Sequence, residues 1–335
     1  MKAESKELSF LRSSLTAESP AFDNSNFLSW FRECDAANAF EVRQIPFAEM
    51  DQWSFEPETK NLVHDSGRFF RIEGLRVETN FERVGRWDQP IINQPEIGIL
   101  GILSKRFAGV RHFLMQAKAG PGNINTLQLS PTVQATQSNY RRVHGGSTPS
   151  YLEYFTEAAD ERRLVDQLQT EQGSRFLKKR NRNMVVDVAD DHEVELLEGF
   201  CWLTLGEIKQ FQWRENFVNM DARSVISCIP YFDPEDGVAD LPEIRALEGF
   251  EKSLFDSLSG ASDTLHSMKL LEAWLTDMKA RYQLRVESIP LAEVENWSIG
   301  ESEIVHESRA HFSVIAVAVE AGQRPVAGLT QPMLR

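Results

Sequence analysis

The feature that most constrains the fold of this chain is an internal repeat. Residues 42–54 (VRQIPFAEMDQWS) and 286–298 (VESIPLAEVENWS) are identical at seven of 13 positions. Other matching segments occur in the same order, at offsets that stay between 242 and 244 residues: Trp30 with Trp274, 62–72 with 304–314, and 87–92 with 329–334. Chance does not explain several matches in one order, so the sequence predicts a duplicated structural unit.

The repeat divides the chain into four expected parts. These are an N-terminal extension over 1–25, a first repeat over 26–235, a helical linker over 236–272 and the start of a second repeat over 273–335. The second copy has no counterpart of the later segments of the first. We therefore expect an incomplete copy, either because the chain is a truncated two-repeat protein or because it is a natural variant that kept only the start of repeat two.

Hydrophobic periodicity predicts a mixture of helices and strands. The spacing of apolar residues predicts helices, and runs of β-branched and aromatic residues predict strands. The expected helices are 27–40, 150–169, 203–216, 245–260 and 267–283, and the expected strands are 40–47, 68–79, 97–103 and 110–119. This succession indicates an α+β fold.

The composition is that of a folded, acidic protein. The 335 residues carry a net charge of −14, which argues against nucleic acid as a main partner because nucleic-acid binding needs a concentrated basic surface. Three scattered cysteines (Cys34, Cys201 and Cys228) predict neither a disulfide framework nor a zinc site. No stretch reaches the ~18 apolar residues of a membrane span, so we expect a cytoplasmic protein with no membrane partner.

A polar strand face is predicted over residues 110–119. Because successive side chains of a strand point to opposite faces, His112, Gln116 and Lys118 should share one face, with Arg111 on the other. Two polar groups and a cation on one strand face suit a ligand-binding surface. A solvent-facing strand is the alternative, and the pattern alone does not decide between them.

A polar, weakly charged run over residues 128–146 follows. Its hydroxyls and amides can donate and accept hydrogen bonds, which suits a hydroxyl-rich ligand, and its arginines suit a phosphate. A surface loop that bonds to itself is the alternative. The candidate ligand-binding or catalytic residues of this run are Ser130, Thr132, Gln134, Asn139, Tyr140, Arg141 and His144.

Two further features suggest chemistry. The segment 174–184 (SRFLKKRNRNM) concentrates basic residues, including Arg175, and predicts either diphosphate contacts or a solvated helix face. His64 recurs as His306, so this position mattered to the ancestral unit, either as a buried hydrogen-bonded histidine or as a general base. Motifs of dinucleotide-binding folds, P-loops, zinc proteases and serine hydrolases are absent from the sequence.

Several long segments resemble one enzyme family. The run WDQPIINQPEIGILG, VRHFLMQAKAGPGN, QLSPTVQATQSNY, VHGG and YLEYF, followed by QGSRFLKKRNRN and FCWLTLGEIKQFQWRENFVNMDARSVISCIP, is similar to the NDP-hexose 2,3-dehydratase family. The resemblance covers residues 25–335, including the repeat. It implies two homologous domains of Nudix-like α+β fold, a homodimer, and a dTDP-linked 4-keto-6-deoxyglucose as substrate, with dehydration across C2 and C3.

The sequence departs from what the resemblance implies at two places. The second domain is incomplete, and Gly120 stands just before the PGN turn where we expect an acidic residue. The acidic REuxEE helix motif of Nudix hydrolases is also absent, which fits a use of that fold without metal-dependent hydrolysis.

The implied reaction is a carbon–oxygen lyase reaction that needs neither a redox cofactor nor a metal. The C4 ketone acidifies the C3 hydrogen, a base removes it, donors stabilise the enolate, and the C2 hydroxyl leaves. The product is a 3,4-diketo-2,6-dideoxy sugar nucleotide for deoxysugar and antibiotic biosynthesis, with a 3-ketoreductase acting downstream. A nucleotide-sugar-binding module without turnover is the alternative.

The resemblance and the residue patterns together give a set of candidate site residues. We expect proton transfer from His64, Tyr140 or His144, and oxyanion stabilisation from Lys118 or Gln116. The expected substrate-binding residues are Trp87, Gln89, Arg111, Gln116, Ser130, Thr132, Gln134, Asn139, Arg141, Tyr151 and Arg175.

Overall fold

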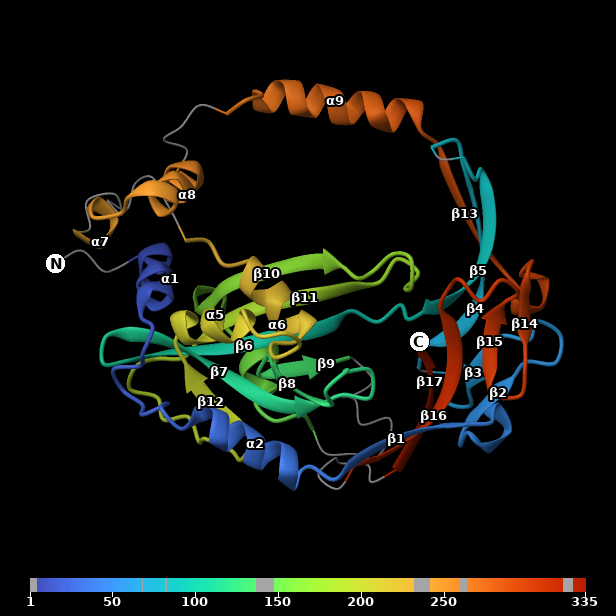
Figure 1. The fold of residues 1–335 in the computed structure, drawn as a ribbon, viewed down its shortest axis with the longest axis horizontal. Helices are drawn as coiled ribbons and strands as arrows, with labels where there is room; N and C mark the ends of the chain where they lie inside the picture. Colours follow the sequence, from blue (N-terminus) through green and yellow to red (C-terminus); the bar gives the residue numbers. More distant parts are fainter. Residues whose placement is uncertain are drawn as a thin grey trace.

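The computed structural model describes residues 5–67, 69–81, 83–136, 148–231, 242–259, 264–321 and 328–335. The described strands form one seven-stranded sheet and two five-stranded sheets, with helices packed mainly on the larger sheet (Figure 1). This arrangement is a mixed α+β fold, as the sequence predicts.

The seven-stranded sheet, here called the central sheet, has the strand order β10-β11-β6-β7-β12. Strand β9 also pairs with β6, and β8 with β7. Strand β11 runs parallel to β6, and the other pairs are antiparallel. The bounds are β6 Gly98–Phe107, β7 Val110–Ala119, β8 Leu127–Ser130, β9 Val133–Ala135, β10 Arg163–Thr170, β11 Arg180–Asp187 and β12 Phe200–Leu203.

Helices cover both faces of the central sheet. One face buries a large aromatic and aliphatic core under four helices, and the other packs on the short helix α4 and its neighbours. Their bounds are α1 Lys6–Leu15, α2 Phe27–Ala37, α5 Leu205–Gln212 and α6 Met220–Ser227 on the first face, and α4 Glu153–Thr156 on the second, followed by the 3-10 turn η2 Asp160–Arg162.

Aromatic contacts hold α2 on the central sheet. The helix places an apolar residue every third or fourth position, so Phe27 and Phe31 point to the same side. The ring of Phe27 stacks on Phe211 with centroids 4.3 Å apart, and Phe31 lies 4.5 Å from Phe217. Both α2 rings are therefore buried.

The two five-stranded sheets are built from both ends of the chain. We call them the first-half sheet (β2, β3, β4, β5 and β13) and the second-half sheet (β14, β15, β16, β17 and β1). The bounds are β1 Phe40–Ile45, β2 Trp53–Phe55, β3 Leu62–His64, β4 Arg71–Thr79, β5 Arg86–Asn93, β13 Leu284–Ile289, β14 Trp297–Ile299, β15 Glu303–His306, β16 Ser313–Ala321 and β17 Gly328–Leu334, with the 3-10 turns η1 Phe47–Glu49 and η5 Leu291–Glu293.

Each of these sheets takes one strand from the other half of the sequence. Strand β1 pairs with β16, placing Ile45 opposite Ala316, and β13 pairs with β4, placing Ile289 opposite Gly74. The two registers correspond residue by residue through the offsets of the sequence repeat. The halves also share one core, in which side chains of both pack together.

A helical segment connects α6, which packs on the central sheet, to β13 of the first-half sheet. It consists of α7 Pro242–Arg245, α8 Gly249–Ser259 and α9 Met268–Arg281. Helix α9 lies apart from the central sheet and buries none of its residues (Figure 1). In the described part of the chain, no helix combines the length and apolar character needed to cross a membrane.

One expected helix is wrong. Residues 150–169 contain only α4 and η2 before the strand β10 begins at Arg163. The residues of β10 include good helix formers, but pairing with β11 over its whole length overrides that weak preference. The basic segment 174–184 is likewise no helix, because it forms the end of the β10–β11 hairpin and the start of β11.

Candidate functional site

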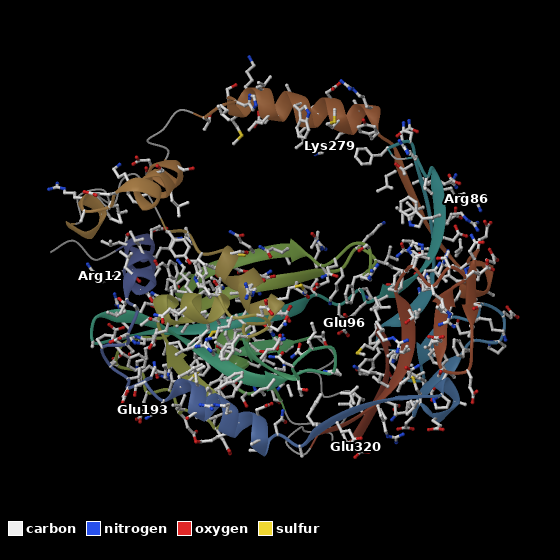
Figure 2. The ribbon with its side chains drawn as sticks, in the orientation of Figure 1. Arg12, Arg86, Glu96, Glu193, Lys279 and Glu320 are labelled. Atoms are coloured by element: carbon white, nitrogen blue, oxygen red, sulfur yellow. The ribbon has the colours of Figure 1, made fainter. Side chains whose placement is uncertain are left out.

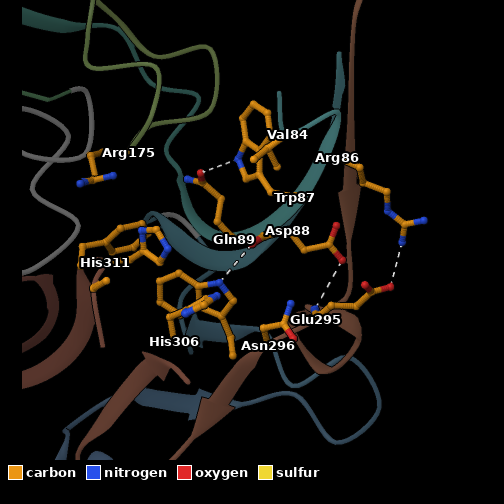
Figure 3. A pocket seen from close by; sticks show the side chains of 13 residues that line it. Val84, Arg86, Trp87, Asp88, Gln89, Arg175, Glu295, Asn296, His306 and His311 are labelled. Carbon is orange, nitrogen blue, oxygen red and sulfur yellow. Dashed lines mark hydrogen bonds and ion pairs between the residues drawn. The ribbon is translucent and has the colours of Figure 1, made fainter. Parts of the chain in front are cut away.

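A pocket of about 800 Å³ lies where the β10–β11 hairpin meets the two five-stranded sheets (Figure 3). One wall comes from β5 and the turn before it, and the opposite wall from β14, β15 and the loops around them. The lining residues are Val84, Arg86, Trp87, Asp88, Gln89, Arg175, Glu295, Asn296, Trp297, His306, Ala310, His311 and Phe312.

Side-chain hydrogen bonds fix the β5 wall. The indole Nε1 of Trp87 donates to Gln89 Oε1 at 3.1 Å, and Gln89 Nε2 donates to the carbonyl of Ser174 at 2.8 Å. Trp87 and Gln89 share a face because they are two residues apart on a strand. Trp87 remains 38% exposed, which leaves an aromatic surface for a ligand.

Arg175 comes from the tip of the β10–β11 hairpin. Its guanidinium carbon lies 4.1 Å from the ring centroid of Phe312, in a cation–π arrangement. Backbone bonds between Ile92 and the 175–177 segment hold this tip against β5. A guanidinium fixed over a ring presents planar N–H donors, which suits a phosphate.

Ion pairs order the far end of the pocket. The buried carboxylate of Asp88 accepts two hydrogen bonds from Arg76, at 2.8 and 3.1 Å. Glu295 pairs with Arg86 at 2.8 Å, and the indole Nε1 of Trp297 donates to the Asp88 carbonyl at 3.1 Å. These contacts join β5 of the first half to the loop before β14 of the second half.

His306, the second-half counterpart of His64, faces this pocket. His306 Nδ1 accepts the backbone N–H of Ser308 at 3.1 Å, so the neutral ring carries its proton on Nε2. Its ring packs on Trp297, with centroids 5.4 Å apart, and on His311 at 4.6 Å. A fixed Nε2–H can donate a hydrogen bond to a ligand.

Three of the expected substrate-binding residues meet in this pocket: Trp87, Gln89 and Arg175. His64 lies elsewhere, in the first-half sheet, where it is 7% exposed and packs on Trp53 and Phe69. Burial lowers its pKa, and its Nδ1 accepts the N–H of Ser66 at 3.2 Å.

Arg111 is buried within the fold, away from the pocket. It forms an ion pair with Asp187 and donates to the hydroxyls of Ser9 and Ser104. These contacts tie the N-terminal helix α1 to the central sheet, so the described structure gives this guanidinium partners other than a diphosphate.

The remaining expected residues of the central sheet are divided between its two faces. Gln116 and Lys118 share the face of His112, whereas Gln134 lies on the face covered by α6 and donates to Asp221. Other hydroxyls bond within the fold. Ser130 accepts from Asn219 Nδ2, Thr132 bonds Leu103 and Leu114, and the Tyr151 hydroxyl bonds Glu195 and Leu197. Asn139, Tyr140, Arg141 and His144 lie outside the described residues.

Sequence reasoning missed half of the pocket. His306 and Trp297 were matched to His64 and Trp53 by the repeat, and that match was the available signal that both positions could matter in each half. Phe312 was matched to Phe70 in the same way, whereas His311 and Glu295 carried no recognisable pattern. Among the described residues, no group of three or more His, Cys, Asp or Glu side chains is placed to hold a metal ion.

Comparison with known proteins then identifies the family. The family described as NDP-hexose 2,3-dehydratase matches residues 24–229 and 268–335. The chain belongs to this family. Three proteins named dTDP-4-dehydro-6-deoxy-alpha-D-glucopyranose 2,3-dehydratase match this chain over more than nine-tenths of its length.

The relatives are longer than this dehydratase-family chain. The protein from Saccharopolyspora spinosa is 48% identical over 97% of the chain and 66% of its own length. The protein from Amycolatopsis orientalis is 47% identical over 91% and 60%, and that from Streptomyces violaceoruber is 43% identical over 93% and 67%. The chain thus spans about two thirds of the length of these relatives.

One solved structure, the complex between the C-terminal domain of mouse MUTYH and human PCNA, aligns with 40% of the dehydratase-family chain and 87% of the matched chain. The TM-score is 0.26 and the sequence identity 12%, which is too low to support any conclusion about the fold.

Proposed function

We propose that this protein removes water across C2 and C3 of an NDP-4-keto-6-deoxyhexose, as a carbon–oxygen lyase of deoxysugar biosynthesis. The observation that carries the proposal is membership of the dehydratase family over most of the chain. The names of the relatives support a dTDP-linked 4-keto-6-deoxyglucose as the substrate.

We propose the Trp87–Arg175 pocket as the site that holds the nucleotide part of this substrate. A pyrimidine can stack on the exposed indole of Trp87, and the guanidinium of Arg175 can pair with the diphosphate. The Nε2–H of His306 adds a donor on the opposite wall. The volume of about 800 Å³ is within the range of small-molecule sites.

The reaction itself needs acid–base groups and an oxyanion donor. The ketone at C4 makes the C3 hydrogen acidic, and an enolate forms when a base takes it. Loss of the C2 hydroxyl as water gives an enol, which becomes the 3,4-diketo sugar. The sequence candidates His64, Tyr140 and His144 for proton transfer, and Lys118 and Gln116 for the oxyanion, remain predictions.

We also propose that the chain arose by duplication of a Nudix-like unit. The equal registers of β1 on β16 and of β13 on β4 support this origin, because independent sheets have no reason to share them. The same boundaries, 26–235 and 273–335 with a linker over 236–272, are proposed for the two units. A homodimer, a cytoplasmic location and a downstream 3-ketoreductase complete the proposal.

Nucleotide binding and turnover test the proposed function separately. Calorimetric titration with dTDP should show binding, and Arg175→Ala should weaken it about 10- to 100-fold, as expected when a charged hydrogen bond of about 1.5–3 kcal/mol is lost. Arg180→Ala, an exposed arginine of the same hairpin, is the matched control and should bind normally.

The dehydration assay uses dTDP-4-keto-6-deoxyglucose and follows formation of the diketo product. Nucleotide binding without product would leave only a binding module. Equal weakening by Arg175→Ala and Arg180→Ala would remove the pocket from the proposal.

A further inference from the structure

A second polar cluster lies at the base of the hairpin whose tip carries Arg175. Glu171 and Lys179 face each other there, and the N–H of Glu171 donates to the Lys179 carbonyl at 3.0 Å. By strand alternation both side chains share a face with Asn181 on β11. The hairpin therefore connects the proposed nucleotide pocket with a set of charged groups under α6.

Amide side chains of the central sheet bond to two carboxylates of this cluster, Glu171 and Asp221. Asn181 Nδ2 donates to the Glu171 carboxylate, and Gln134 Nε2 donates to the carboxylate of Asp221 in the first turn of α6. Burial, followed by the nearby charge of Asp221, raises the pKa of Glu171. A carboxylate with a raised pKa is a stronger base than an exposed one.

Lys179 supplies a buried cation beside Glu171. Its residue is only 5% exposed, and its ammonium donates to the Glu96 carbonyl. Burial lowers the pKa of Lys179, while Glu96 and Glu171 oppose that effect. Figure 2 shows Glu96 between the central sheet and the five-stranded sheets, on the side where the hairpin reaches across.

A buried amide oxygen without a hydrogen-bond partner among the described residues points to a polar ligand beside this cluster, two residues along β11 from Asn181. Asn183 is 1% exposed and shares the face of Asn181, to whose carbonyl its Nδ2 donates at 3.3 Å. Its Oδ1 is buried and has no hydrogen-bond partner in the described part of the structure. Because buried acceptors are almost always satisfied, a hydroxyl or water belongs beside it.

Gly98 leaves room for the side-chain amide of Asn181. A Cβ built on Gly98 would lie 2.9 Å from Asn181 Oδ1, too close for an ordinary contact. The absence of a side chain on β6 therefore lets the Asn181 amide sit over the strand and reach Glu171.

We propose that Glu171 and Lys179 form the acid–base centre of the dehydration, with Asn181 and Asp221 as positioning residues. This inference rests on the proposed function. Lys179 lies in the basic segment 174–184, for which the sequence predicted diphosphate contacts or a solvated face, whereas no sequence pattern singled out Glu171. Arg175 is only four residues from Glu171, so the two are separated by at most ~14 Å of chain. One extended nucleotide sugar can therefore contact both.

The step balances with these two residues. The Glu171 carboxylate takes the C3 proton, and the electrons of that C–H bond form the enolate, whose C4 oxygen the Lys179 ammonium stabilises. The C2–O bond then breaks, and the protonated Glu171 gives the same proton to the departing hydroxyl, which leaves as water. Glu171 returns to its carboxylate form, and no oxidant or other reactant is needed.

The test follows the C3 hydrogen of dTDP-4-keto-6-deoxyglucose by proton NMR in D₂O. Its loss, by exchange or by elimination, reports proton abstraction, while calorimetry with dTDP reports the pocket. Glu171→Gln and Lys179→Met should each slow this loss about 10²- to 10⁴-fold, the usual range for such groups, with dTDP affinity within twofold of the unaltered protein. The matched controls are Glu215→Gln and Lys178→Met, both exposed, which should leave the rate unchanged.

Two further variants separate chemistry from folding. Glu171→Asp keeps a carboxylate and should retain more activity than Glu171→Gln. Asp221→Asn removes a charge that raises the Glu171 pKa, so the acidic limb of the rate–pH profile should move to lower pH.

Each result decides the inference. Proton loss at the normal rate in Glu171→Gln would overturn it, and so would dTDP binding without any loss of the C3 hydrogen in the unaltered protein. Absence of dTDP binding would instead remove the proposed function, and the inference with it.

Discussion

His112 is fully buried between the central sheet and the segment that follows α1. Its Nδ1 bonds the Val110 carbonyl at 2.9 Å, and its Nε2 lies 2.8 Å from the Ser19 hydroxyl. The neutral ring satisfies both bonds by donating from Nδ1 and accepting at Nε2. Burial lowers the pKa of His112, because the charged ring would lose its hydration.

The shift predicts a dependence of stability on pH. The unfolded chain binds a proton near the ordinary histidine pKa of about 6.5, whereas the folded protein binds it only at lower pH. The free energy of unfolding should therefore fall as the pH drops below about 6.5 towards the lowered folded value. Urea denaturation at several pH values should show this slope, and His112→Gln should flatten it.

His266→Gln is the control for that measurement, since His266 is exposed. The same slope in His112→Gln as in the unaltered protein would show that burial of this ring does not govern the dependence.

At the level of single residues, the sequence named some of the residues that line the proposed nucleotide pocket. Trp87, Gln89 and Arg175 were named as candidates from two separate segments, and they line one pocket in the structure, while their role in substrate binding stays a prediction. Arg111 illustrates why other residues could not be placed. Its partner Asp187 is 76 residues away in the chain, and no local pattern marks that pair.

The capped start of α5 makes a prediction at the level of elements. The Thr204 hydroxyl accepts the N–H of Glu207, and the Glu207 carboxylate accepts the N–H of Thr204. Thr204 also donates to the Thr16 carbonyl. Thr204→Ala should lower the free energy of unfolding by about 1–2 kcal/mol, the usual cost of a lost N-cap.

Ser267→Ala removes the cap of α9 and serves as the comparison. Because α9 buries no residue, its cap should matter less to unfolding of the core, and chemical denaturation should give a smaller loss. An equal loss in both variants would show that α9 unfolds together with the central sheet.

Elements with strong local patterns were predicted correctly, and those set by distant pairing were not. Helices α2, α5, α8 and α9 and strands β1, β4, β6 and β7 match their expected segments. The strand β10 was mistaken for a helix, because Leu, Gln and Arg favour a helix locally while its partner β11 lies further along the chain.

At the level of the whole molecule, β1 and β13 each complete the sheet of the other half of the sequence. Ile289 belongs to the second half of the sequence, yet it is 6% exposed and paired with Gly74 of the first-half sheet. A Cβ on Gly74 would lie 2.9 Å from Ile289 Cγ1, so the two fit closely. Neither half can complete its sheet alone.

This arrangement predicts coupling between the halves. Ile289→Ala should lower the free energy of unfolding by about 2–5 kcal/mol, as for other buried isoleucines, and should speed amide hydrogen exchange in β4. Mass spectrometry of the exchanged peptides measures the effect. Val286→Ala, on the same strand but 39% exposed, is the control and should have little effect.

If Ile289→Ala left the rate of amide hydrogen exchange in β4 unchanged, β13 would contribute little to the first-half sheet. The sequence predicts a repeat that spans strands of both five-stranded sheets. The sequence could not show that β1 and β13 each join the sheet of the other half, because pairing β13 with β4 or with β16 would satisfy the same pattern of side chains.

The pairing of β4 with the distant strand β13 also has a consequence during synthesis on the ribosome. Strand β4 ends at Thr79, but its partner β13 begins at Leu284, so everything between them must be translated first. At about 5–20 residues per second this takes roughly 10–40 s, during which one edge of β4 stays open to any other strand in the cell. Nascent chains therefore need a chaperone, or fast folding of the intervening central sheet, to avoid aggregating through that edge.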